Sequence, residues 1–529
     1  MSARLRSALS EDRWPLAFGA VALLLLVLHI SALGSSPPGL YVDEASVGYN
    51  AWAVAHTGHD EHGHFLPFYF EAFGEYKNPV YIYALAPLTR ILPLTPALVR
   101  FPAALFSLAA CAALALFAHW ATRSRGAALL TLLTAGITPW LVQEGRLGFE
   151  VVSMVALLAV MLWCLARAVA TDSARWYGAA GAALGLSTFA YSTGRAFTVM
   201  LLVALALCFG ISSRSRRWLA AAVGPVVALI TLGIYVGLHR GVITARYNAI
   251  SIGFDSPGLP TLVQRFLSNY ADYWDVRFLF TQGDPNLRHS TGFGGMLLVT
   301  TLPAILVGAA VCARRFREPL PRFVLLGALL GPVPAALTAE GTPHSLRAAC
   351  MLPFLLAFSA YGWCSLLHLM RDRRALAVAA ALGVAVAAES GSYFYDMFVE
   401  YPGRAAGWFD TAQGPAMASA AELAGGHQVF VSTTLEGGYI EAMFALRPDP
   451  PPEGTTPQQL LDNMGIHFAD PATIRGSAHS GDMLVLAPDD PVPTGAQIIE
   501  VGRVDAGGGA VSIVGSLRHP VDLVVIARD

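Results

Sequence analysis

The stretch VVSMVALLAVMLWCLARAVA, residues 151–170, holds a single charged side chain, Arg167, in twenty positions. A helix needs about 20 consecutive, predominantly apolar residues to cross the hydrocarbon core of a bilayer. A run of this length and composition therefore predicts a membrane-spanning helix. The whole composition agrees, because 55% of the 529 residues are hydrophobic and only 13% are charged.

Similar apolar runs recur on both sides of this stretch. Those that are long enough, or nearly so, to cross a bilayer are residues 16–33, 101–120, 127–141, 177–191, 197–211, 218–238, 294–313, 323–337, 348–370 and 375–388. The first follows several arginines, as in a signal peptide, but no convincing cleavage site of small residues comes after it. We therefore predict an all-α polytopic membrane protein with about eleven spans.

Arginines mark one side of the predicted bundle. They gather in the N-terminal segment and in every second connection: Arg4, Arg6, Arg13, Arg123, Arg125, Arg167, Arg175, Arg214, Arg216, Arg217, Arg314, Arg315, Arg317, Arg322, Arg371, Arg373 and Arg374. Short cytoplasmic loops carry an excess of arginine and lysine. We therefore predict a multi-pass protein of the plasma (inner) membrane with a cytoplasmic N-terminus. Segments 34–99, 143–148, 239–291 and 339–347 and everything after Glu389 are then extracytoplasmic.

Composition also excludes several classes of protein. The formal net charge is -2, so there is no basic field of the kind that binds nucleic acid. All six cysteines fall inside apolar runs, where they are expected to serve as small core residues rather than as disulfides. The sequence contains no P-loop, zincin motif, nucleophile elbow or dinucleotide fingerprint.

The character of the sequence changes after residue 390. Short β-like runs at residues 429–431, 483–486, 498–501 and 523–526 alternate with helix-like stretches at residues 416–423 and 457–464. We predict a transmembrane module over residues 1–390 and a small extracytoplasmic α/β domain over residues 391–529.

The first external loop, residues 34–99, is the most informative segment. It is long and rich in acids, histidines and aromatics, whereas helical bundles use short connections unless a loop has a function. A helix is expected over residues 45–57, with Asp43 as its N-cap and Gly58 at its end, and a second helix is expected to start at Pro79.

The acidic pair Asp43-Glu44 admits two interpretations. A partly desolvated carboxylate beside a like charge has a raised pKa, which suits a general base that deprotonates an acceptor. A cap and a first-turn acid that complement the helix dipole would also give this pattern. The pair therefore marks Asp43 as a candidate base without deciding the matter.

Cationic residues on the predicted outer side point to an anionic ligand. Lys77 is the only lysine in the chain and lies in the same loop as Asp43. Arg146, Arg195, Arg288 and Arg347 sit at external helix ends, where the positive-inside bias disfavours them unless they pair with an anion. A lipid phosphate is the expected partner, and snorkelling to headgroups is the alternative.

Three further external segments have residues that could carry chemistry. The run from His59 to His64 (HDEHGH) has metal-ligand residue types but is too dense for one tetrahedral site. Residues 283–290 (GDPNLRHS) and 340–347 (EGTPHSLR) are turn-like and lie next to predicted spans. Both are compatible with structural turns or with ligand binding.

Taken together, these segments resemble the membrane glycosyltransferases of the GT-C fold, specifically the bacterial relatives of protein O-mannosyltransferases and of the lipid A aminoarabinose transferase. The resemblance rests on YVDE at 41–44, GHDEHG at 58–63, FGEYKNP at 73–79, GRLGF at 145–149, GDPNLRHS at 283–290 and EGTPH at 340–344. These motifs span roughly the first two thirds of the chain and share the predicted outer face.

The resemblance implies transfer of a sugar from a polyprenyl-phosphate carrier to an acceptor, with inversion at the anomeric carbon. Asp43 is then the general base, and Glu44 orients the acceptor or Asp43. The resemblance places the donor and its phosphate among Lys77, Arg146, Arg195, Asp60, Glu61, Tyr76, Arg288, His289, Glu340 and His344. No cofactor or metal is expected, because cationic side chains can stabilise a monophosphate leaving group without a divalent ion.

Other classes of function remain open at the level of sequence. A transporter or flippase predicts charged or broken helices near the bilayer midplane and an inverted repeat, whereas here the polar residues gather at one face. A ligase that uses a diphosphate-linked glycan would more often need a metal or a histidine base. A non-catalytic receptor would tolerate substitutions in the first loop. The acceptor, whether protein, lipid or glycan, is not specified by the sequence.

Overall fold

The computed structural model describes residues 13–210, 216–239, 250–255, 258–339, 341–369, 373–409, 413–487, 490–491, 500–503, 511–516 and 524–527. The chain divides into two compact units. We call the first the helical unit; it comprises Met1–Ser31, Ala103–Arg146 and Glu150–Asp396. We call the second the mixed unit; it comprises Ala32–Pro102, Leu147–Phe149 and Met397–Asp529.

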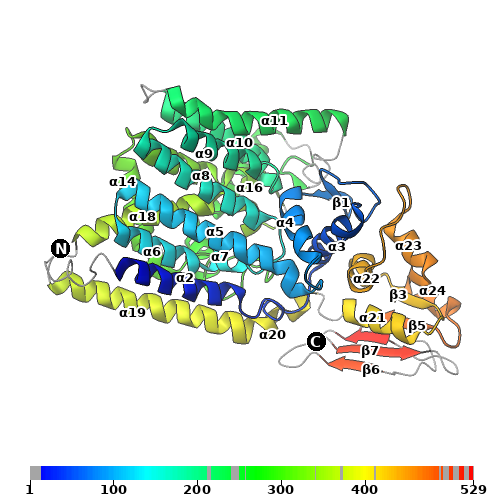
Figure 1. Ribbon diagram of the computed structural model, residues 1–529. Helices are drawn as coiled ribbons and strands as arrows, with labels where there is room; N and C mark the ends of the chain where they lie inside the picture. Colours follow the sequence, from blue (N-terminus) through cyan, green and yellow to red (C-terminus); the bar gives the residue numbers. More distant parts are fainter. Residues whose placement is uncertain are drawn as a thin grey trace. The chain divides into compact units, whose positions relative to one another are not determined.

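The helical unit is a bundle of apolar helices (Figure 1). Its α-helices are α2 (Trp14–Ile30), most of α5 (Pro96–Thr122), α6 (Arg125–Gly136), α7 (Pro139–Glu144), α8 (Val151–Thr171), α9 (Ala174–Ser187), α10 (Ser192–Leu205), α11 (Ala220–Leu238), α13 (Leu259–Asp272), α14 (Leu302–Arg314), α15 (Pro319–Leu330), α16 (Val333–Ala336), α17 (Ser345–Ala348), α18 (Leu352–Leu369) and α19 (Arg373–Tyr395). Short 3-10 or π segments include η2 (Ala206–Gly210), η3 (Arg216–Leu219), η4 (Arg277–Thr281), η5 (Val299–Thr301) and η6 (Ala349–Met351).

Each predicted span coincides with a helix in the described part of the chain. Seven helices there are long and apolar enough to cross a membrane: Pro96–Thr122, Val151–Thr171, Ser192–Gly210, Arg216–Leu238, Pro319–Ala336, Ser345–Leu369 and Ala377–Trp408. The other predicted runs fall on the shorter helices α2, α6, α9 and α14. The chain is therefore a multi-pass membrane protein, as the hydrophobic runs predict.

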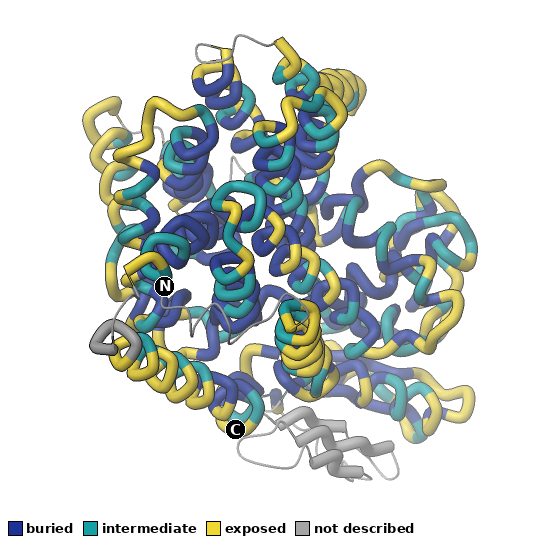
Figure 2. The backbone as a smooth tube through the Cα atoms, turned by 60° about the vertical axis from the view of Figure 1, so that its left-hand side comes forward, coloured by how far each residue is buried: buried dark blue, intermediate teal, exposed yellow. Residues whose placement is uncertain are grey.

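Burial separates the inner helices from the outer ones (Figure 2). In the most apolar part of Val151–Thr171, 78% of the residues are buried, whereas the values are 17% for Arg216–Leu238 and 11% for Ala377–Trp408. The exposed side chains of the outer helices include Val223, Val227 and Ile230. Exposed apolar side chains on a helix that satisfies its own backbone suit contact with lipid.

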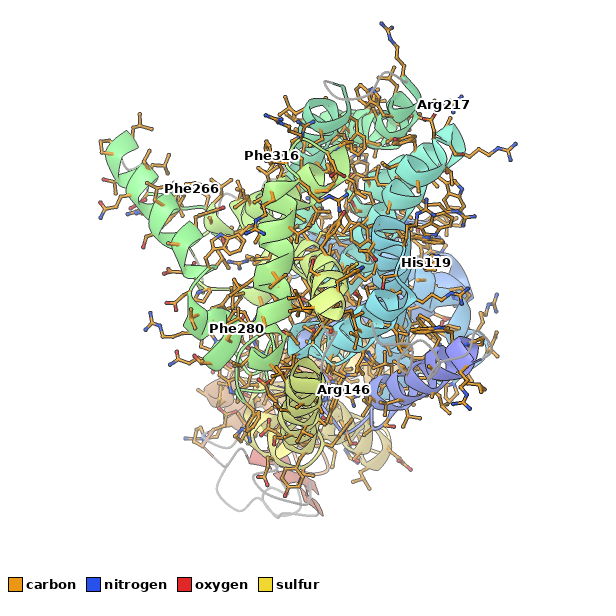
Figure 3. The ribbon with its side chains drawn as sticks, turned by 90° about the vertical axis from the view of Figure 1, so that its left-hand side faces the viewer. His119, Arg146, Arg217, Phe266, Phe280 and Phe316 are labelled. Atoms are coloured by element: carbon orange, nitrogen blue, oxygen red, sulfur yellow. The ribbon has the colours of Figure 1, made fainter. Side chains whose placement is uncertain are left out.

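Figure 3 places Arg217 and Phe316 toward one end of the helical unit and Phe280 and Arg146 toward the other. The first two lie in connections that we predict to be cytoplasmic, and the other two lie in segments that we predict to be external. These four residues therefore lie as the alternation predicts, whereas the labelled Phe266 of a predicted external segment lies nearer to Phe316 in this view.

Glycines bring helices α14 and α18 into close contact. A Cβ at Gly362 of α18 would overlap the backbone carbonyl of Ala304 in α14, and a Cβ at Gly308 of α14 would overlap the carbonyl of Phe358. Small residues at helix crossings let the backbones of membrane helices approach closely. This crossing therefore depends on the absence of a side chain at both glycines.

Gly362→Ala is expected to lower the free energy of unfolding by about 1–3 kcal/mol, because the added methyl group overpacks the crossing. The measurement is thermal unfolding of the purified protein in detergent. Gly383→Ala is the matched control, since no atom lies within 4 Å of a Cβ at that helical glycine. Equal stability of the two variants would contradict this account of the crossing.

The mixed unit combines the first external loop with the C-terminal region. The loop contributes α3 (Val42–Thr57), the hairpin of β1 (Phe70–Ala72) and β2 (Glu75–Lys77), and α4 (Pro79–Thr89). The C-terminal region contributes η7 (Asp396–Glu400), α20 (Tyr401–Ala405), η8 (Ala406–Trp408), α21 (Gln413–Leu423), β3 (Val429–Ser432), α22 (Gly438–Leu446), α23 (Pro457–Asn463), β4 (Ile466–Ala469), α24 (Pro471–Ser477), β5 (Met483–Leu486), β6 (Glu500–Arg503), β7 (Val511–Ser516) and β8 (Val524–Ala527).

The C-terminal strands form one mixed sheet in the order β4-β3-β5-β8-β7-β6. Strand β3 is parallel to β4 and β5, β5 is parallel to β8, and β7 is antiparallel to β6 and β8. The β-like runs at residues 429–431 and 483–486 are confirmed as β3 and β5. Strands β4 and β7 were not predicted, because their residues do not form a continuous apolar run.

Packing divides the chain differently from the predicted boundary at residue 390. Tyr49 and Ala53 of α3 share a hydrophobic core with Ile440 and Met443 of α22 and with Val431 of β3. The first external loop therefore belongs with the C-terminal region rather than with the helices that precede and follow it. Hydropathy could not predict this arrangement, because it reveals where a segment leaves the bilayer but not what the segment packs on.

Candidate functional site

The acidic pair lies in the first turn of α3. The helix begins at Val42, with Tyr41 as its N-cap, and Gly58 ends it at a φ of 81°. The backbone N–H of Tyr41 donates to Glu44 Oε2 at 3.2 Å, so the glutamate reaches back to satisfy the helix start. The prediction that Asp43 is the N-cap is therefore wrong, whereas the predicted end at Gly58 is confirmed.

Glu44 is fully buried and bound by charge-assisted hydrogen bonds. Its two carboxylate oxygens accept from Arg100 Nε and Nη2, each at 2.8 Å, in a bidentate pair. The backbone N–H of Gly148 donates to Oε1 at 2.7 Å. With four donors around it, counting Tyr41 N–H, the carboxylate is satisfied by the protein itself. Glu44 therefore anchors the first turn.

Arg100 is a residue of this site that sequence analysis missed. Its guanidinium is fully buried and also donates to the carbonyl oxygens of Leu33, Pro37 and Gly39, at 3.0, 2.7 and 2.7 Å. It ties the chain that enters α3 to the start of the long helix α5. The available signal was an arginine at the external end of an apolar run, but nothing in the sequence indicates its partner Glu44, which lies 56 residues earlier.

Asp43 and Lys77 form an ion pair in the mixed unit. Lys77 Nζ pairs with Asp43 Oδ1 and lies 3.2 Å from Glu75 Oε1. The lysine side chain is only 8% exposed, whereas the Asp43 side chain is 32% exposed. The β1–β2 hairpin positions the lysine, and its ammonium lies 5.7 Å from the centre of the Phe73 ring. An accessible carboxylate therefore stands beside a well-held positive charge.

Asp60 and Glu61 hold their own loop. Asp60 Oδ1 accepts from the backbone N–H groups of His62 and His64, both at 2.9 Å. Glu61 Oε2 accepts from Asn50 Nδ2 of α3 at 2.7 Å, and its other oxygen accepts from the hydroxyl of Tyr439 in α22 at 3.2 Å. Both acids are fully buried. They join the loop to α3 and α22.

Two titratable groups near these acids have altered pKa values. Burial lowers the pKa of His62, but the hydrogen bond to Glu61 and nearby negative charge outweigh this effect and raise the pKa above its ordinary value. Tyr76, on β2, is half-buried, and burial together with the charge of Glu71 raises its pKa. Tyr76 is therefore a neutral hydroxyl that can donate a hydrogen bond near neutral pH.

The remaining predicted site residues belong to the helical unit. Arg146 is fully buried, and its guanidinium donates to the carbonyls of Leu28, His29 and Ser31 at 3.2, 3.4 and 2.6 Å. It therefore binds the C-terminal end of α2, which sequence analysis did not predict. Arg195 lies in the first turn of α10.

The two predicted turn segments of the helical unit meet at a cluster. Asp284 Oδ2 lies 3.1 Å from His289 Nδ1, and the His289 and His344 rings have centroids 4.5 Å apart. Burial raises the pKa of Asp284, but the hydrogen bond from His289 and the charges of both histidines outweigh it and hold the pKa below its ordinary value. Arg288 precedes His289, and its carbonyl accepts from Gln143 Nε2 at 3.0 Å. Glu340 lies outside the described residues.

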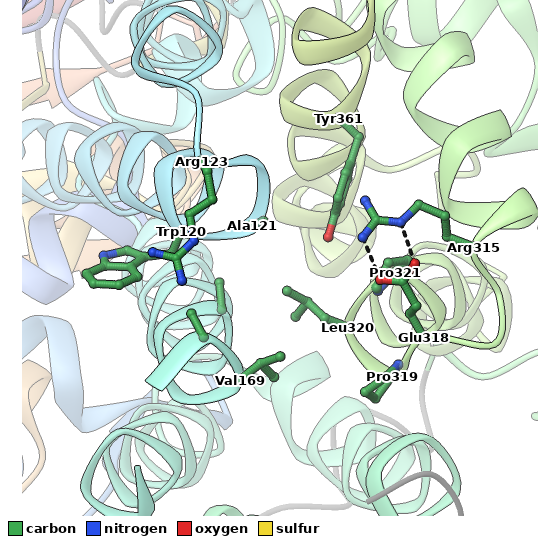
Figure 4. Close-up of a pocket in the computed structure, with 12 residues that line it drawn as sticks. Trp120, Ala121, Arg123, Val169, Arg315, Glu318, Pro319, Leu320, Pro321 and Tyr361 are labelled. Atoms are coloured by element: carbon green, nitrogen blue, oxygen red, sulfur yellow. Dashed lines mark hydrogen bonds and ion pairs between the residues drawn. The ribbon is translucent and has the colours of Figure 1, made fainter. Parts of the chain in front are cut away.

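A separate cavity of about 180 Å³ lies in the helical unit. Figure 4 shows Trp120 and Arg123 on one side and Tyr361 and Arg315 on the other, with Arg315 Nε donating to Glu318 Oε1 at 2.6 Å. These residues border arginine-rich connections that we predict to be cytoplasmic. The cavity is therefore not part of the predicted acceptor or donor site.

The comparisons first establish the fold. The chain has the fold of the GT-C membrane glycosyltransferases, so the predicted resemblance is confirmed at the level of the fold. A family model described as dolichyl-phosphate-mannose-protein mannosyltransferase matches residues 76–237, a segment that includes Lys77, Arg146 and Arg195. No curated protein sequence matches the chain.

Particular solved structures share this fold. ArnT from Cupriavidus metallidurans bound to undecaprenyl phosphate aligns with a TM-score of 0.56 and 14% identity over 96% of this chain and 98% of ArnT. The apo state of ArnT gives a TM-score of 0.52 and 15% identity over 90% and 94%. The apo oligosaccharyltransferase of Archaeoglobus fulgidus gives 0.50 and 15% over 81% of this chain, which spans only 64% of that enzyme.

Proposed function

We propose that this protein is a membrane glycosyltransferase that moves a sugar from a polyprenyl-monophosphate carrier to an extracytoplasmic acceptor, with inversion. The observation that carries the proposal is the pairing of Asp43 with Lys77 in the mixed unit. A base for the acceptor and a cation for the leaving group are the two charges that such a transfer requires.

In the proposed step, an acceptor hydroxyl attacks the anomeric carbon of the donor sugar while Asp43 Oδ takes the hydroxyl proton. The bond between the anomeric carbon and the phosphate oxygen breaks, and its electron pair leaves with the polyprenyl phosphate. Attack from the face opposite to the leaving group inverts the anomeric carbon. Lys77 then donates to the phosphate, whose negative charge grows as the bond breaks.

The ion pair between Asp43 and Lys77 allows a carboxylate and an ammonium to lie side by side before substrate binds. Without substrate, the ammonium of Lys77 pairs with the carboxylates of both Asp43 and Glu75. When a donor phosphate competes for the ammonium, Asp43 loses its ionic partner and becomes a better proton acceptor. Binding of the carrier therefore prepares the base.

Glu44 and Arg100 position this base. Because both are fully buried and hydrogen-bonded to each other, they fix the first turn of α3 and with it the backbone of Asp43. Of the two roles expected for Glu44, we propose the positioning of Asp43. The role of Tyr76 toward the substrate remains a prediction, because Tyr76 and Lys77 are neighbours on β2 and neighbouring side chains of a strand point to opposite faces.

The comparisons support a lipid-phosphate donor. The ArnT structure that aligns over nearly the whole chain contains undecaprenyl phosphate, and the matching family model is described by a dolichyl-phosphate sugar donor. We propose that a monophosphate needs only protein cations, so the transfer itself requires no divalent ion. Roles of Arg146, Arg195 and Arg288 toward the phosphate remain predictions.

Lys77→Met is expected to weaken binding of a polyprenyl monophosphate by roughly ten- to a hundredfold, the value of one charge-assisted hydrogen bond. Lys77→Arg keeps the positive charge, so its affinity for the carrier should fall less than that of Lys77→Met. The measurement is equilibrium binding of a radiolabelled carrier to the purified protein in detergent. Unchanged affinity in Lys77→Met would remove the lysine from phosphate recognition, whereas equal losses in both variants would indicate a requirement for a compact ammonium.

A further inference from the structure

Two connections of the helical unit bring one aspartate and two histidines together. Asp284 and His289 lie in the segment between η4 and η5, and His344 immediately precedes α17. One metal-ligand atom from each residue lies within 4.8 Å of the other two. Among the residues that the structure describes, no other three acidic, histidine or cysteine side chains lie close enough together to bind one ion.

The backbone around the cluster holds the carboxylate in a fixed orientation. Asp284 Oδ1 accepts from Asn286 N–H at 2.9 Å, and Oδ2 accepts from Ser345 N–H at 2.7 Å. The N–H of His344 lies 3.4 Å from the hydroxyl oxygen of Tyr273, a fully buried residue. Outer hydrogen bonds of this kind orient the ligands of metal sites.

With both imidazoles neutral, as histidine ligands of a metal are, the single carboxylate of the cluster favours a cation over a phosphate. Asp284 is 3% exposed and His289 is 6% exposed, so a carboxylate and an imidazole share a site with little water. A buried carboxylate repels an anion, and burial of a charge is costly unless a counter-charge is present. The roles toward a lipid phosphate that the resemblance implied for His289 and His344 therefore fit this geometry less well.

We propose that Asp284, His289 and His344 bind a divalent transition-metal ion, with Zn²⁺ as the best fit. Two imidazole nitrogens and one carboxylate oxygen are borderline ligands that suit zinc rather than magnesium or calcium. Ligand atoms around a tetrahedral zinc lie about 3.4 Å apart, so closure of the cluster needs side-chain shifts on the order of 1 Å. A fourth position remains for water or a ligand.

Such an ion would join two connections that are distant in sequence. The segment between η4 and η5 and the turn before α17 both lie in regions that we predict to be external. The ion acts as a clamp between them, and it is not required for the Asp43 step. Metal binding at this cluster and sugar transfer at Asp43 are therefore independent properties, and either can be present without the other.

The test is metal content of full-length protein purified in detergent without a polyhistidine tag. The protein is stripped with chelator, exposed to Zn²⁺ and freed of excess metal, and the bound zinc is measured by mass spectrometry. We expect about one zinc per chain and a higher melting temperature than in the stripped protein, since a ligand that binds only the folded state stabilises it. A parallel sample with inorganic phosphate is expected to show no such shift.

His289→Ala and Asp284→Asn are expected to lose the bound zinc. The matched control is His467→Ala, because His467 also pairs with an aspartate, Asp462, at 3.1 Å, but belongs to no such cluster among the residues that the structure describes. His344→Cys supplies a thiolate in place of the imidazole and should retain the metal. With Co²⁺ as the probe, this variant should gain a thiolate-to-metal charge-transfer band, which a variant with a purely structural change would not show.

A wild-type protein that takes up no Zn²⁺, Co²⁺ or Mn²⁺ after stripping would overturn the proposal. Full zinc content in both His289→Ala and Asp284→Asn would also overturn it, by placing the ion elsewhere. If these variants do not fold, the His344→Cys cobalt spectrum decides the question, because absence of the thiolate band in a folded, cobalt-loaded protein contradicts ligation by residue 344.

Discussion

Asp43→Asn is expected to reduce sugar transfer by about 10²–10⁴-fold, the usual contribution of a general base. The amide keeps the size of the side chain but cannot accept the acceptor's proton. Because the Asp43 side chain is 32% exposed, the variant should fold and should still bind the carrier through Lys77. The measurement is single-turnover transfer at saturating donor, together with carrier affinity.

Asp172→Asn provides the matched control for this prediction. It makes the same chemical change at an exposed aspartate that pairs with Arg217 at 2.6 Å, next to a connection predicted to be cytoplasmic. It should transfer sugar at the wild-type rate. If Asp43→Asn did so as well, Asp43 would not be the base, and the pairing with Lys77 would be structural.

Arg100→Met is expected to lower the free energy of unfolding by about 3–5 kcal/mol, because it leaves the Glu44 carboxylate buried without its ionic partner. The loss arises in the folded state, where the methionine also leaves the carbonyls of Leu33, Pro37 and Gly39 without a donor. Thermal unfolding in detergent and limited proteolysis of the mixed unit measure the effect.

Two comparisons separate this buried pair from ordinary surface pairs. Arg265→Met breaks an exposed pair with Asp255 and should leave the melting temperature nearly unchanged. Glu44→Gln combined with Arg100→Met removes both charges and should recover part of the loss. If Arg100→Met were as stable as Arg265→Met, the positioning role of the Glu44–Arg100 pair would be refuted.

The membrane-spanning part of the fold was predictable because a helix that crosses a bilayer needs a long, predominantly apolar run, which is visible in the sequence. The runs at residues 151–170 and 218–238 became α8 and α11 with small shifts in their ends. The grouping of the first loop with the C-terminal region was not predictable. It depends on side-chain packing between Tyr49 and Met443, which are almost 400 residues apart, and hydropathy carries no information on such pairs.

Some residues of the candidate site were also predictable from the sequence, whereas others were not. Asp43 and Lys77 stood out because an acidic pair and a single lysine are local features of one loop. Arg100 and Tyr439 did not, since an arginine at a helix end and a tyrosine in a soluble region gain their meaning only from the partners that the fold gives them, Glu44 and Glu61. The start of α3 also differs from the prediction, because the side chain of Glu44, and not that of Asp43, accepts the hydrogen bond from the backbone N–H of Tyr41.

The central claim is transfer from a polyprenyl-monophosphate sugar with Asp43 as the base. The most direct measurement incubates purified wild-type and Asp43→Asn protein with a panel of polyprenyl-monophosphate and diphosphate sugars, and follows release of the carrier and inversion at the anomeric carbon. The account predicts turnover with at least one monophosphate donor, a β product from an α donor or the reverse, and loss of turnover in the variant. Turnover with diphosphate donors alone, or full activity of Asp43→Asn, would contradict it.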